Sequence, residues 1–149
     1  MAERVQELTE DGLTDYLHLL GNLDSENSMP LVEARQMLRT VASYPYYKIF
    51  CIYAEERMLA TYSLIILDNF GHGGKKIALL EDVVVDETAR GQGFGRQMID
   101  DAMNRSREHG CYKLMLSSDS KRKGAHAFYE HLGFQRHGIS FRTELIPND

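Results

Sequence analysis

A glycine-rich turn is the feature that most restricts how this chain can fold. The segment Arg90–Gly95 reads Arg-Gly-Gln-Gly-Phe-Gly and lies between a valine run, 83–85, and an amphipathic stretch that stops at Gly110. Glycines allow the backbone to approach a ligand closely, and the free N–H groups and dipole of a helix start favour an anion. With Arg90 and Arg96 beside it, the turn is predicted to hold a pyrophosphate. A tight turn with a purely structural role is the alternative.

The surrounding sequence alternates strand-like and helix-like segments. Apolar and β-branched runs predict strands at Tyr47–Ala54, Met58–Leu67, Ile77–Asp86, Cys111–Ser118 and Ile139–Leu145. Helical periodicity predicts helices at Asp11–Leu20, after a Ser28 cap, after Gly95 and at Lys121–Leu132. Alternation of strands and helices in the second half implies at least one parallel strand pair. The expected fold class is therefore α/β, a mixed sheet with helices on both faces.

Length and composition indicate one globular domain, residues 1–149. Hydrophobic residues make up 43% and charged residues 26%, and the net charge of −5 argues against a nucleic-acid binder. No apolar run approaches the length of a membrane span, and the N-terminus has no apolar signal core. Cys51 and Cys111 form neither a disulfide framework nor a zinc ligand set. We expect a cytoplasmic protein that binds no metal and no membrane.

Two common phosphate-binding folds do not fit the turn. A Walker-type loop needs Gly-Lys-Ser/Thr, which the sequence lacks. A dinucleotide fold places its glycine turn after the first strand, whereas this turn follows the third predicted strand and leaves only residues 96–149 after it. The glycine turn must therefore bind its pyrophosphate within a fold other than these two.

Two separated motifs resemble the GNAT superfamily of acyl-CoA N-acyltransferases. Arg90–Gly95 matches the pattern Arg/Gln-x-x-Gly-x-Gly/Ala of its motif A, and Leu80–Asp86 resembles the preceding fourth strand. Phe128–Phe134, which reads Phe-Tyr-Glu-His-Leu-Gly-Phe, resembles its motif B. The order of elements also agrees, so the resemblance covers nearly the whole chain.

The resemblance implies a mixed, mostly antiparallel sheet whose parallel central pair splays apart, with helices on both faces. It also implies acetyl-CoA as co-substrate, with the pantetheine arm along the backbone of the fourth strand and the pyrophosphate in the glycine turn. The cofactor-binding residues implied are Val83, Val84, Val85, Arg90, Gly91, Gln92, Gly93, Phe94, Gly95, Arg96, Phe128 and Tyr129.

Catalytic roles also follow from the resemblance. Tyr129 matches the motif B tyrosine near the thioester sulfur, where a phenol can protonate a departing thiolate; a core aromatic is the alternative. The substrate amine must lose a proton before it attacks, and the family often supplies a base at the position of Glu81. Glu81 and Asp82 are adjacent on one strand, so their side chains are expected on opposite faces. A strand-end carboxylate paired with Lys or Arg is the alternative for Glu81.

Other residues are candidates for the substrate side of the site. Glu81, Asp82, Ser117 and Asp119 are the predicted substrate-binding residues, with Asn27, Met29, Tyr46 and Tyr47 as further lining candidates. The basic run Lys121–Lys123 is either a solvated loop or a contact for the nucleotide 3′-phosphate or an anionic substrate. Asp119 is alternatively only a helix cap. His126 and His131 are expected at surface or helix-end positions.

The combined prediction is an enzyme that moves an acetyl group from acetyl-CoA to a primary amine of a small molecule, by direct transfer in a ternary complex. Some segments resemble glucosamine-6-phosphate N-acetyltransferases and others aminoalkylphosphonate N-acetyltransferases, and this resemblance favours a phosphorylated or otherwise anionic amine. The alternatives are a non-catalytic acyl-CoA-binding or sensing module and a protein N-acetyltransferase. Members of the superfamily are often dimers through their last strands, which makes a homodimer plausible.

Overall fold

The structure is a computed structural model that describes residues 3–22 and 29–146, so Asn27 and Ser28 lie outside the described residues. The chain divides into two compact units, Met1–Leu116 and Ser117–Asp149. The first contains the sheet and its covering helices, and the second contains one helix and the C-terminal segment.

The strands of the first unit form one sheet in the order β1-β2-β3-β4-β5. Their bounds are β1 Glu3–Glu7, β2 Tyr47–Ala54, β3 Arg57–Leu67, β4 Lys76–Val85 and β5 Cys111–Met115. All neighbours are antiparallel except β4 and β5, which are parallel. The expected α/β class, a mixed and mostly antiparallel sheet with a parallel pair, is confirmed.

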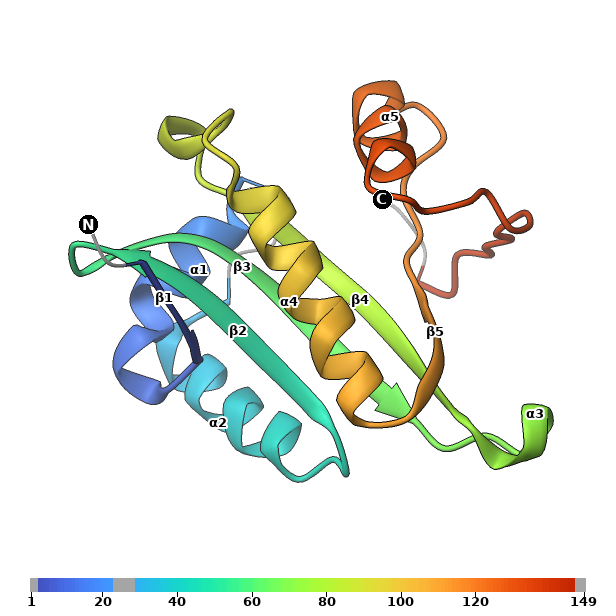
Figure 1. Cartoon of the computed structure of the whole chain (residues 1–149). Coiled ribbons are helices and arrows are strands. Elements are labelled where there is room, and N and C mark those ends of the chain that lie inside the picture. The colour runs from blue at the N-terminus through green and yellow to red at the C-terminus, as the bar shows by residue number, and fades with distance from the viewer. Residues whose placement is uncertain (1–2, 23–28, 147–149) are drawn as a thin grey trace. The chain divides into compact units, whose positions relative to one another are not determined.

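The helices of the first unit cover both faces of this sheet (Figure 1). Their bounds are α1 Leu13–Leu20, α2 Leu31–Ala42, the short α3 Gly71–Gly74 and α4 Phe94–Glu108, with 3-10 turns η1 Glu10–Gly12 and η2 Glu87–Ala89. α1 and α2 pack on one face, here called the α1 face, through a core that includes Leu13, Tyr16, Ile49, Cys51 and Val84. α4 covers the opposite face and buries Met98, Ile99 and Ala102 completely. The apolar stripe predicted for this helix is thus its packing surface.

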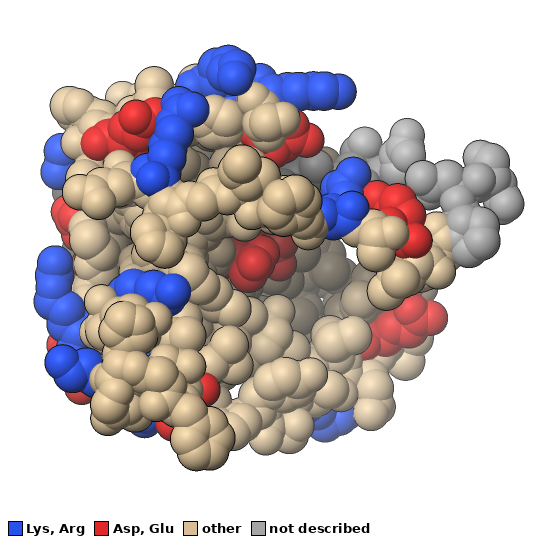
Figure 2. Space-filling model, turned by 90° about the vertical axis from the view of Figure 1, so that its right-hand side faces the viewer, with Lys and Arg blue, Asp and Glu red and all other residues tan. Residues whose placement is uncertain are grey.

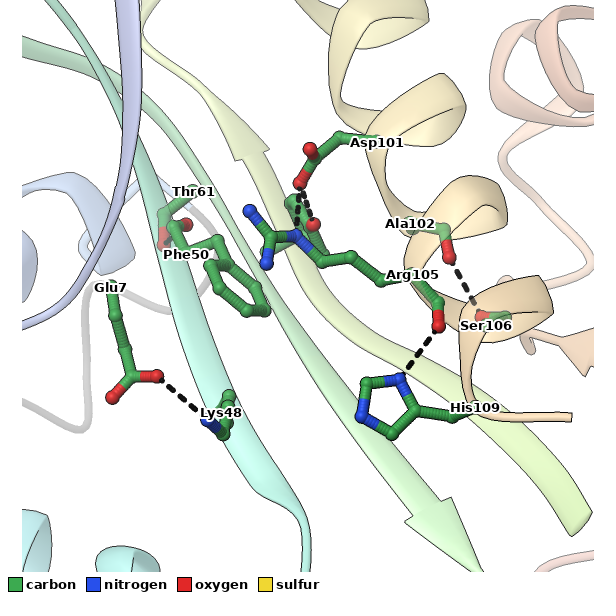
Figure 3. A network of polar contacts seen from close by, with 10 residues as sticks. Glu7, Lys48, Phe50, Thr61, Asp101, Ala102, Arg105, Ser106 and His109 are labelled. Atoms are coloured by element: carbon green, nitrogen blue, oxygen red, sulfur yellow. Dashed lines mark hydrogen bonds and ion pairs between the residues drawn. The ribbon is translucent and has the colours of Figure 1, made fainter. Parts of the chain in front are cut away.

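A polar network fastens α4 to the sheet (Figure 3). The fully buried Tyr62 donates its hydroxyl hydrogen to Asp101, and Arg105 Nε donates to the same carboxylate at 2.8 Å. The Arg105 guanidinium lies 3.8 Å from the centre of the Phe50 ring. This network holds α4, and hence the turn at its start, in a fixed position on β2 and β3.

Charged side chains of both signs mix at the surface. Lys and Arg side chains are interspersed with Asp and Glu on the face shown in Figure 2. Exposed pairs include Arg35 with Glu10 at 3.0 Å and Lys48 with Glu7 at 3.3 Å. Such exposed pairs contribute little stability, so the fold depends mainly on its two apolar layers.

Two strand predictions need correction. β1 was not predicted, because its residues are mostly exposed and polar and carry no apolar alternation. Ile139–Leu145 was predicted as a strand and is not one: it has no regular secondary structure, and Ile139 and Phe141 are 81% and 89% exposed. A strand needs a neighbour for its backbone N–H and C=O groups, which alternation alone does not supply.

The second unit is built around α5, Lys123–His131. The helix ends with the N–H of Phe134 bonded to the carbonyl of Tyr129 at 3.0 Å, and Arg136 pairs with Glu130 at 2.7 Å. Within the part of the chain that the structure describes, no helix combines the length and apolarity needed to cross a bilayer.

Candidate active site

One edge of β4 is paired with a neighbouring strand along only part of its length. Its parallel pairing with β5 runs from Lys76 to Leu79, while β4 itself continues to Val85. Among the described residues, no strand pairs with this later part of β4 on the β5 side. The parallel pairing therefore stops at Leu79, opposite the last residue of β5, Met115, and an extended ligand could take the place of a strand beyond it.

The ladder with β3 shows which backbone groups face that free edge. The N–H of Asp86 donates to the carbonyl of Leu59 at 2.8 Å, so Asp86 directs its backbone toward β3. Backbone direction alternates along an antiparallel strand, and Val84 therefore also faces β3 while Val85 faces the open side. Val83 lies in a β-bulge, where this alternation does not apply. Val85 is thus one of the two residues whose backbone the sequence predicted for a pantetheine arm, and Val83 stays a prediction.

The glycine turn begins at Arg90, five residues after the end of β4 at Val85. Gly91 and Gly93 have φ values of 78° and 88°, which L side chains rarely adopt. Gly93 is the N-cap of α4, which has no side-chain cap and no acidic residue in its first turn. The first helical N–H groups are thus free for an anion, and the helix dipole adds positive potential. The turn has the geometry that the sequence predicted for a pyrophosphate.

The side chains of the turn differ in their exposure. Arg90, Gln92 and Arg96 are exposed, whereas the Phe94 side chain is 5% exposed and packs in the core. Gln92 Nε2 donates to the carbonyl of Thr88 at 3.3 Å. Phe94 could therefore reach a ligand only through its backbone, while the two arginine side chains remain available.

A β-bulge interrupts β4 at the acidic pair. Ser63 is opposite Glu81 and Thr61 is opposite Val84, so one residue of β3 faces two of β4. Asp82 lies within this bulge with a φ of 48°, an uncommon conformation for a residue other than glycine. Strict alternation of side chains does not hold here, so the premise from which Glu81 and Asp82 were predicted to point to opposite faces does not apply at this position.

Glu81 and Asp82 are both exposed. Glu81 lies on the α1 face of the sheet, because it is opposite Ser63, which is itself opposite Ile49 of the α1-face core. Burial raises the pKa of Asp82, and burial and the Asp82 charge raise the pKa of Glu81. Burial and the charges of these two carboxylates raise the pKa of Tyr47. No ion pair to Glu81 or Asp82 occurs among the described side chains, so the alternative interpretation of Glu81 as half of a salt bridge has no partner there.

Tyr16 and Ser63 also belong to this cluster, although the sequence did not identify them as site residues. Tyr16 is 8% exposed and Ser63 is 1% exposed. Burial and the Asp82 charge raise the pKa of Tyr16, and a hydrogen bond from Ser63 lowers it. A serine inside an otherwise apolar strand was the signal in the sequence, since a buried hydroxyl requires a partner.

The further candidates for the substrate side lie toward different faces of the sheet. Tyr47 lies beside the acidic pair, and Met29 packs against the α1-face core. Tyr46 instead contacts His109 at the end of α4, with ring centres 4.7 Å apart, and so lies toward the other face.

The second unit contains the remaining candidates. Tyr129 lies near the end of α5 between the rings of Phe128 and Phe134, whose centres are 5.4 and 5.8 Å from its own. Burial raises the pKa of the Tyr129 phenol, against a smaller opposing effect of Arg122. The phenol is therefore protonated at neutral pH, as a proton donor must be.

The segment before α5 forms an ordered turn. Asp119 Oδ1 accepts from the N–H of Lys121 at 2.8 Å, and the Asp119 carbonyl accepts from the N–H of Arg122 at 3.0 Å and from His126 Nε2 at 2.8 Å. Asp119 thus shapes this turn, whereas the N-cap of α5 is Arg122. Ser117 and the run Lys121–Lys123 are exposed. The described residues contain no group of His, Cys, Asp and Glu side chains suited to a metal ion.

Comparisons with known proteins agree with this geometry. The family model described as Acetyltransferase (GNAT) family matches residues 11–134. The chain is 37% identical over 141 residues to the glucosamine 6-phosphate N-acetyltransferase of Trypanosoma brucei brucei, covering 93% of this chain and 92% of that protein.

Solved structures show the same fold. A putative acetyltransferase from Agrobacterium tumefaciens has a TM-score of 0.90 at 27% identity, over 95% of this chain and 99% of that one. The glucosamine-6-phosphate N-acetyltransferase from Arabidopsis thaliana has a TM-score of 0.87 at 26% identity, over 98% of this chain and 100% of that one. With the family pattern spanning most of its length, the chain belongs to the GNAT family of acetyltransferases.

Proposed function

We propose that this acetyltransferase uses acetyl-CoA to acetylate the primary amine of a small phosphorylated amino sugar, with glucosamine 6-phosphate as the first candidate. The observation that carries the proposal is the free edge of β4, which leads into a glycine turn whose helix start is uncapped. Two relatives that match over most of their length, from Trypanosoma brucei brucei and Arabidopsis thaliana, carry the name glucosamine 6-phosphate N-acetyltransferase, which supports this candidate.

The first unit offers binding groups for acetyl-CoA, which supplies the acetyl group as a thioester. The backbone groups of Val85, which face the open side, and those of the neighbouring Val83 are the proposed contacts for an amide-containing arm. The N–H groups of 91–95 are suited to a pyrophosphate, with Arg90 and Arg96 as flanking cations. These residues form the proposed cofactor site.

Glu81 is the proposed base. An ammonium has no free electron pair, so Glu81 must take a proton from it, directly or through water, before the nitrogen attacks the thioester carbon. A backbone N–H of β4 stabilises the negative charge that develops on the carbonyl oxygen. Tyr129 then donates its phenolic proton to the sulfur as the C–S bond breaks, and its raised pKa keeps that proton in place beforehand.

The basic run Lys121–Lys123 is a proposed contact for a phosphate, either that of the substrate or the 3′-phosphate of the nucleotide. Its side chains are exposed, and Asp119 and His126 hold the turn that presents them. Cationic side chains at a helix start oppose the helix dipole, which favours an anionic ligand.

We further propose that both units belong to one catalytic domain in a cytoplasmic homodimer. The family match at 11–134 includes residues of both units, and Cys51 and Cys111 are free thiols, as a reducing compartment allows. The segment 139–146 supports the dimer, because it alternates like a strand and keeps four large apolar side chains 80–89% exposed: Ile139, Phe141, Leu145 and Ile146.

An amine panel tests the proposal. Purified protein with acetyl-CoA is offered glucosamine 6-phosphate, unphosphorylated glucosamine, an aminoalkylphosphonate, a polyamine and an amino acid. We expect the highest kcat/KM with the amino sugar phosphate, and the matched sugar without phosphate isolates the contribution of that group. A preference for the aminoalkylphosphonate would replace phosphorylated amino sugars by aminoalkylphosphonates as the proposed substrate class. Transfer only to a protein or peptide would contradict a small-molecule enzyme.

A further inference from the structure

Tyr62 is the residue of β3 that lies opposite the bulge in β4. Thr61 is paired with Val84 and Ser63 with Glu81, so Tyr62, between them, faces the two bulged residues of β4. Its side chain is fully buried. A buried phenol requires a hydrogen-bond partner, and the partner of Tyr62 comes from the helix that follows the glycine turn.

That partner is Asp101 on α4, whose carboxylate accepts the phenolic hydrogen of Tyr62. Arg105 Nε donates to the same carboxylate at 2.8 Å (Figure 3), and the Arg105 guanidinium lies 3.8 Å from the centre of the Phe50 ring on β2. Burial, together with the hydrogen bond to Asp101, raises the pKa of Tyr62, so the phenol keeps its hydrogen. Asp101 is thus held by one donor from the sheet and one from its own helix, and its charge strengthens both bonds.

The helix needs such a bond because its main contact with the sheet is apolar. The buried stripe of α4 contains Met98, Ile99 and Ala102, each without exposed surface. Apolar contacts are not directional, so they hold a helix against a sheet without fixing its rotation. A slip by one residue would move each backbone group by about 1.5 Å along the axis and turn it by about 100°. The hydrogen bond from Tyr62 is directional and opposes such a slip.

The rotation of α4 matters because its first turn is the proposed pyrophosphate site. The first hydrogen bond of the helix runs from the N–H of Gln97 to the carbonyl of Gly93 at 3.1 Å, which leaves the N–H groups of 94–96 for a ligand. Acetyl-CoA would contact these groups and the open backbone of Val85 at the same time. Groups that bind one ligand must keep their relative positions to within about 0.5 Å. Tyr62 joins the two, because it faces the bulge before Val85 and bonds to α4.

We propose that Tyr62 is a positioning residue for acetyl-CoA: its hydrogen bond to Asp101 fixes α4 on the sheet, so that the start of α4 and the open edge of β4 are aligned for one bound cofactor. Tyr62 is buried in the core and does not touch the cofactor. The inference rests on the proposed function, because it requires that the glycine turn binds the pyrophosphate. A buried polar network suits such a role, since apolar side chains could stabilise the same interface equally well.

Tyr62→Phe tests this role, with Ser106→Ala as the matched control. Each substitution removes one buried hydroxyl group, but Ser106 Oγ donates to the carbonyl of Ala102 at 2.7 Å, within α4 itself. We expect Tyr62→Phe to raise the dissociation constant and the KM of acetyl-CoA about tenfold, which corresponds to about 1.4 kcal/mol, and to leave the KM for the amine unchanged. Ser106→Ala should change none of these values, even where both variants melt at a lower temperature.

Two further measurements isolate the contact. In an Asp101→Ala background, Tyr62→Phe should change the acetyl-CoA dissociation constant by less than about twofold, because the acceptor is already missing. NMR of the free protein reports the geometry without any turnover. Tyr62→Phe should shift the backbone amide signals of Gly93 and Gly95, and Ser106→Ala should leave them in place.

The outcomes separate the inference from the proposed function. Unchanged acetyl-CoA affinity in folded Tyr62→Phe, an equal loss in Ser106→Ala, or a loss fully additive with Asp101→Ala overturns the positioning role even if the enzyme acetylates amines. The expected losses of acetyl-CoA affinity, without transfer to any amine, support the role and overturn the function. If Tyr62→Phe fails to fold, Asp101→Ala replaces it and should weaken acetyl-CoA binding by the same factor; unchanged affinity in that variant overturns the role.

Discussion

Arg57 and Asp86 form an ion pair at the entrance to the glycine turn, with 2.9 Å between Arg57 Nη2 and Asp86 Oδ2. The same carboxylate accepts hydrogen bonds from the backbone N–H of Thr88, at 3.2 Å, and from its hydroxyl. Arg57 also donates to the Thr88 hydroxyl at 2.8 Å. These contacts fasten the start of β3 to η2, which leads into the turn, so the position of the turn depends on a few polar contacts at the surface.

Replacing Asp86 should therefore loosen the turn without unfolding the protein. Asp86→Ala removes the cap of η2 and the partner of Arg57, and we expect it to cost about 1 kcal/mol of unfolding free energy and to weaken acetyl-CoA binding several-fold. Denaturant unfolding and calorimetry measure the two effects. Asp68→Ala, which removes an exposed aspartate from the loop after β3, should change neither. Equal acetyl-CoA affinity in Asp86→Ala and wild type would show that the Asp86 contacts do not influence the proposed cofactor site.

The Asp86 contacts also predict a pH dependence of stability. Hydrogen bonds from Thr88, with the Arg57 charge, lower the pKa of Asp86 below its ordinary value of 3.8. A carboxyl whose pKa is lower in the folded state stabilises the fold above its unfolded pKa and loses this contribution as the pH falls through the folded pKa. Between pH 5 and 2, the unfolding free energy of Asp86→Ala should decline less than that of wild type. Parallel declines would show that the carboxyl is not stabilised by folding.

Gly93→Asp tests the glycine turn. The substitution adds a carboxylate where a pyrophosphate is proposed to bind, and it forces a side chain onto a φ of 88°. We expect acetyl-CoA affinity to fall below detection in a protein that still folds, with about 1–2 kcal/mol lost to backbone strain. Gly73→Asp is the matched control, since Gly73 has a φ of 69° and open space around it but lies in α3. Calorimetry that finds unchanged affinity in folded Gly93→Asp would reject the assigned turn.

Tyr129→Phe removes one oxygen atom and keeps the packing against Phe128 and Phe134. Because general acid catalysis contributes about 10²–10⁴-fold, we expect kcat to fall roughly 10- to 1000-fold while the dissociation constant of acetyl-CoA stays nearly constant. Steady-state kinetics on the best amine gives the first value and calorimetry the second. Turnover equal to wild type would assign Tyr129 to the core of the second unit alone.

The main elements of the fold could be predicted from the sequence because burial imposes a pattern on them. β3 is buried almost throughout from Met58 to Ile66, so it is recognised in the sequence as an apolar run. α4 has one apolar stripe, so it is recognised by its helical periodicity. β1 has no such pattern, since it is a mostly exposed edge strand. Its place in the sheet depends on pairing with β2, which is a long-range contact that no local pattern encodes.

The site was only partly predictable for a similar reason. Glycine at positions 91 and 93 indicates from the sequence that the backbone can adopt positive φ there. The left-handed conformation of Asp82 and the bulge around it instead arise from a register shift of β4 against β3. That shift removes the simple alternation from which the faces of the two carboxylates could have been predicted. Tyr16 has the helical spacing of a core residue, and the structure buries it with Leu13 and Leu19 on α1.

The C-terminal segment gives a prediction about assembly. If a second copy of the chain covers the exposed side chains of 139–146, Phe141→Asp should shift the protein from dimer to monomer, because burying an unpaired charge in an apolar interface is costly. Sedimentation equilibrium measures the mass. Phe70→Asp is the control, because it places the same charge on a fully exposed phenylalanine in the loop before α3. A wild-type protein that stays monomeric over the micromolar range would contradict the proposed homodimer.

Glu81→Gln separates a catalytic role of Glu81 from a structural one. If Glu81 accepts the proton of the amine, kcat/KM should fall about 100-fold at neutral pH and recover partly at high pH, where free amine exists before binding. The free energy of unfolding of the variant should stay the same or increase at neutral pH. Burial and Asp82 raise the pKa of Glu81, so its ionised form is disfavoured in the folded state and lowers stability above the folded pKa. The glutamine variant should therefore melt at the same or a higher temperature at pH 7.

The decisive measurement places the pH–rate profile of this variant beside its melting curve. Glu87→Gln, in the exposed first turn of η2, is the control and should match wild type in both. A profile like that of wild type, together with a lowered melting temperature, would remove Glu81 from the mechanism. The proton would then leave through Asp82 or through a water molecule bound to the backbone of the bulge, because these are the remaining acceptors beside the open edge of β4.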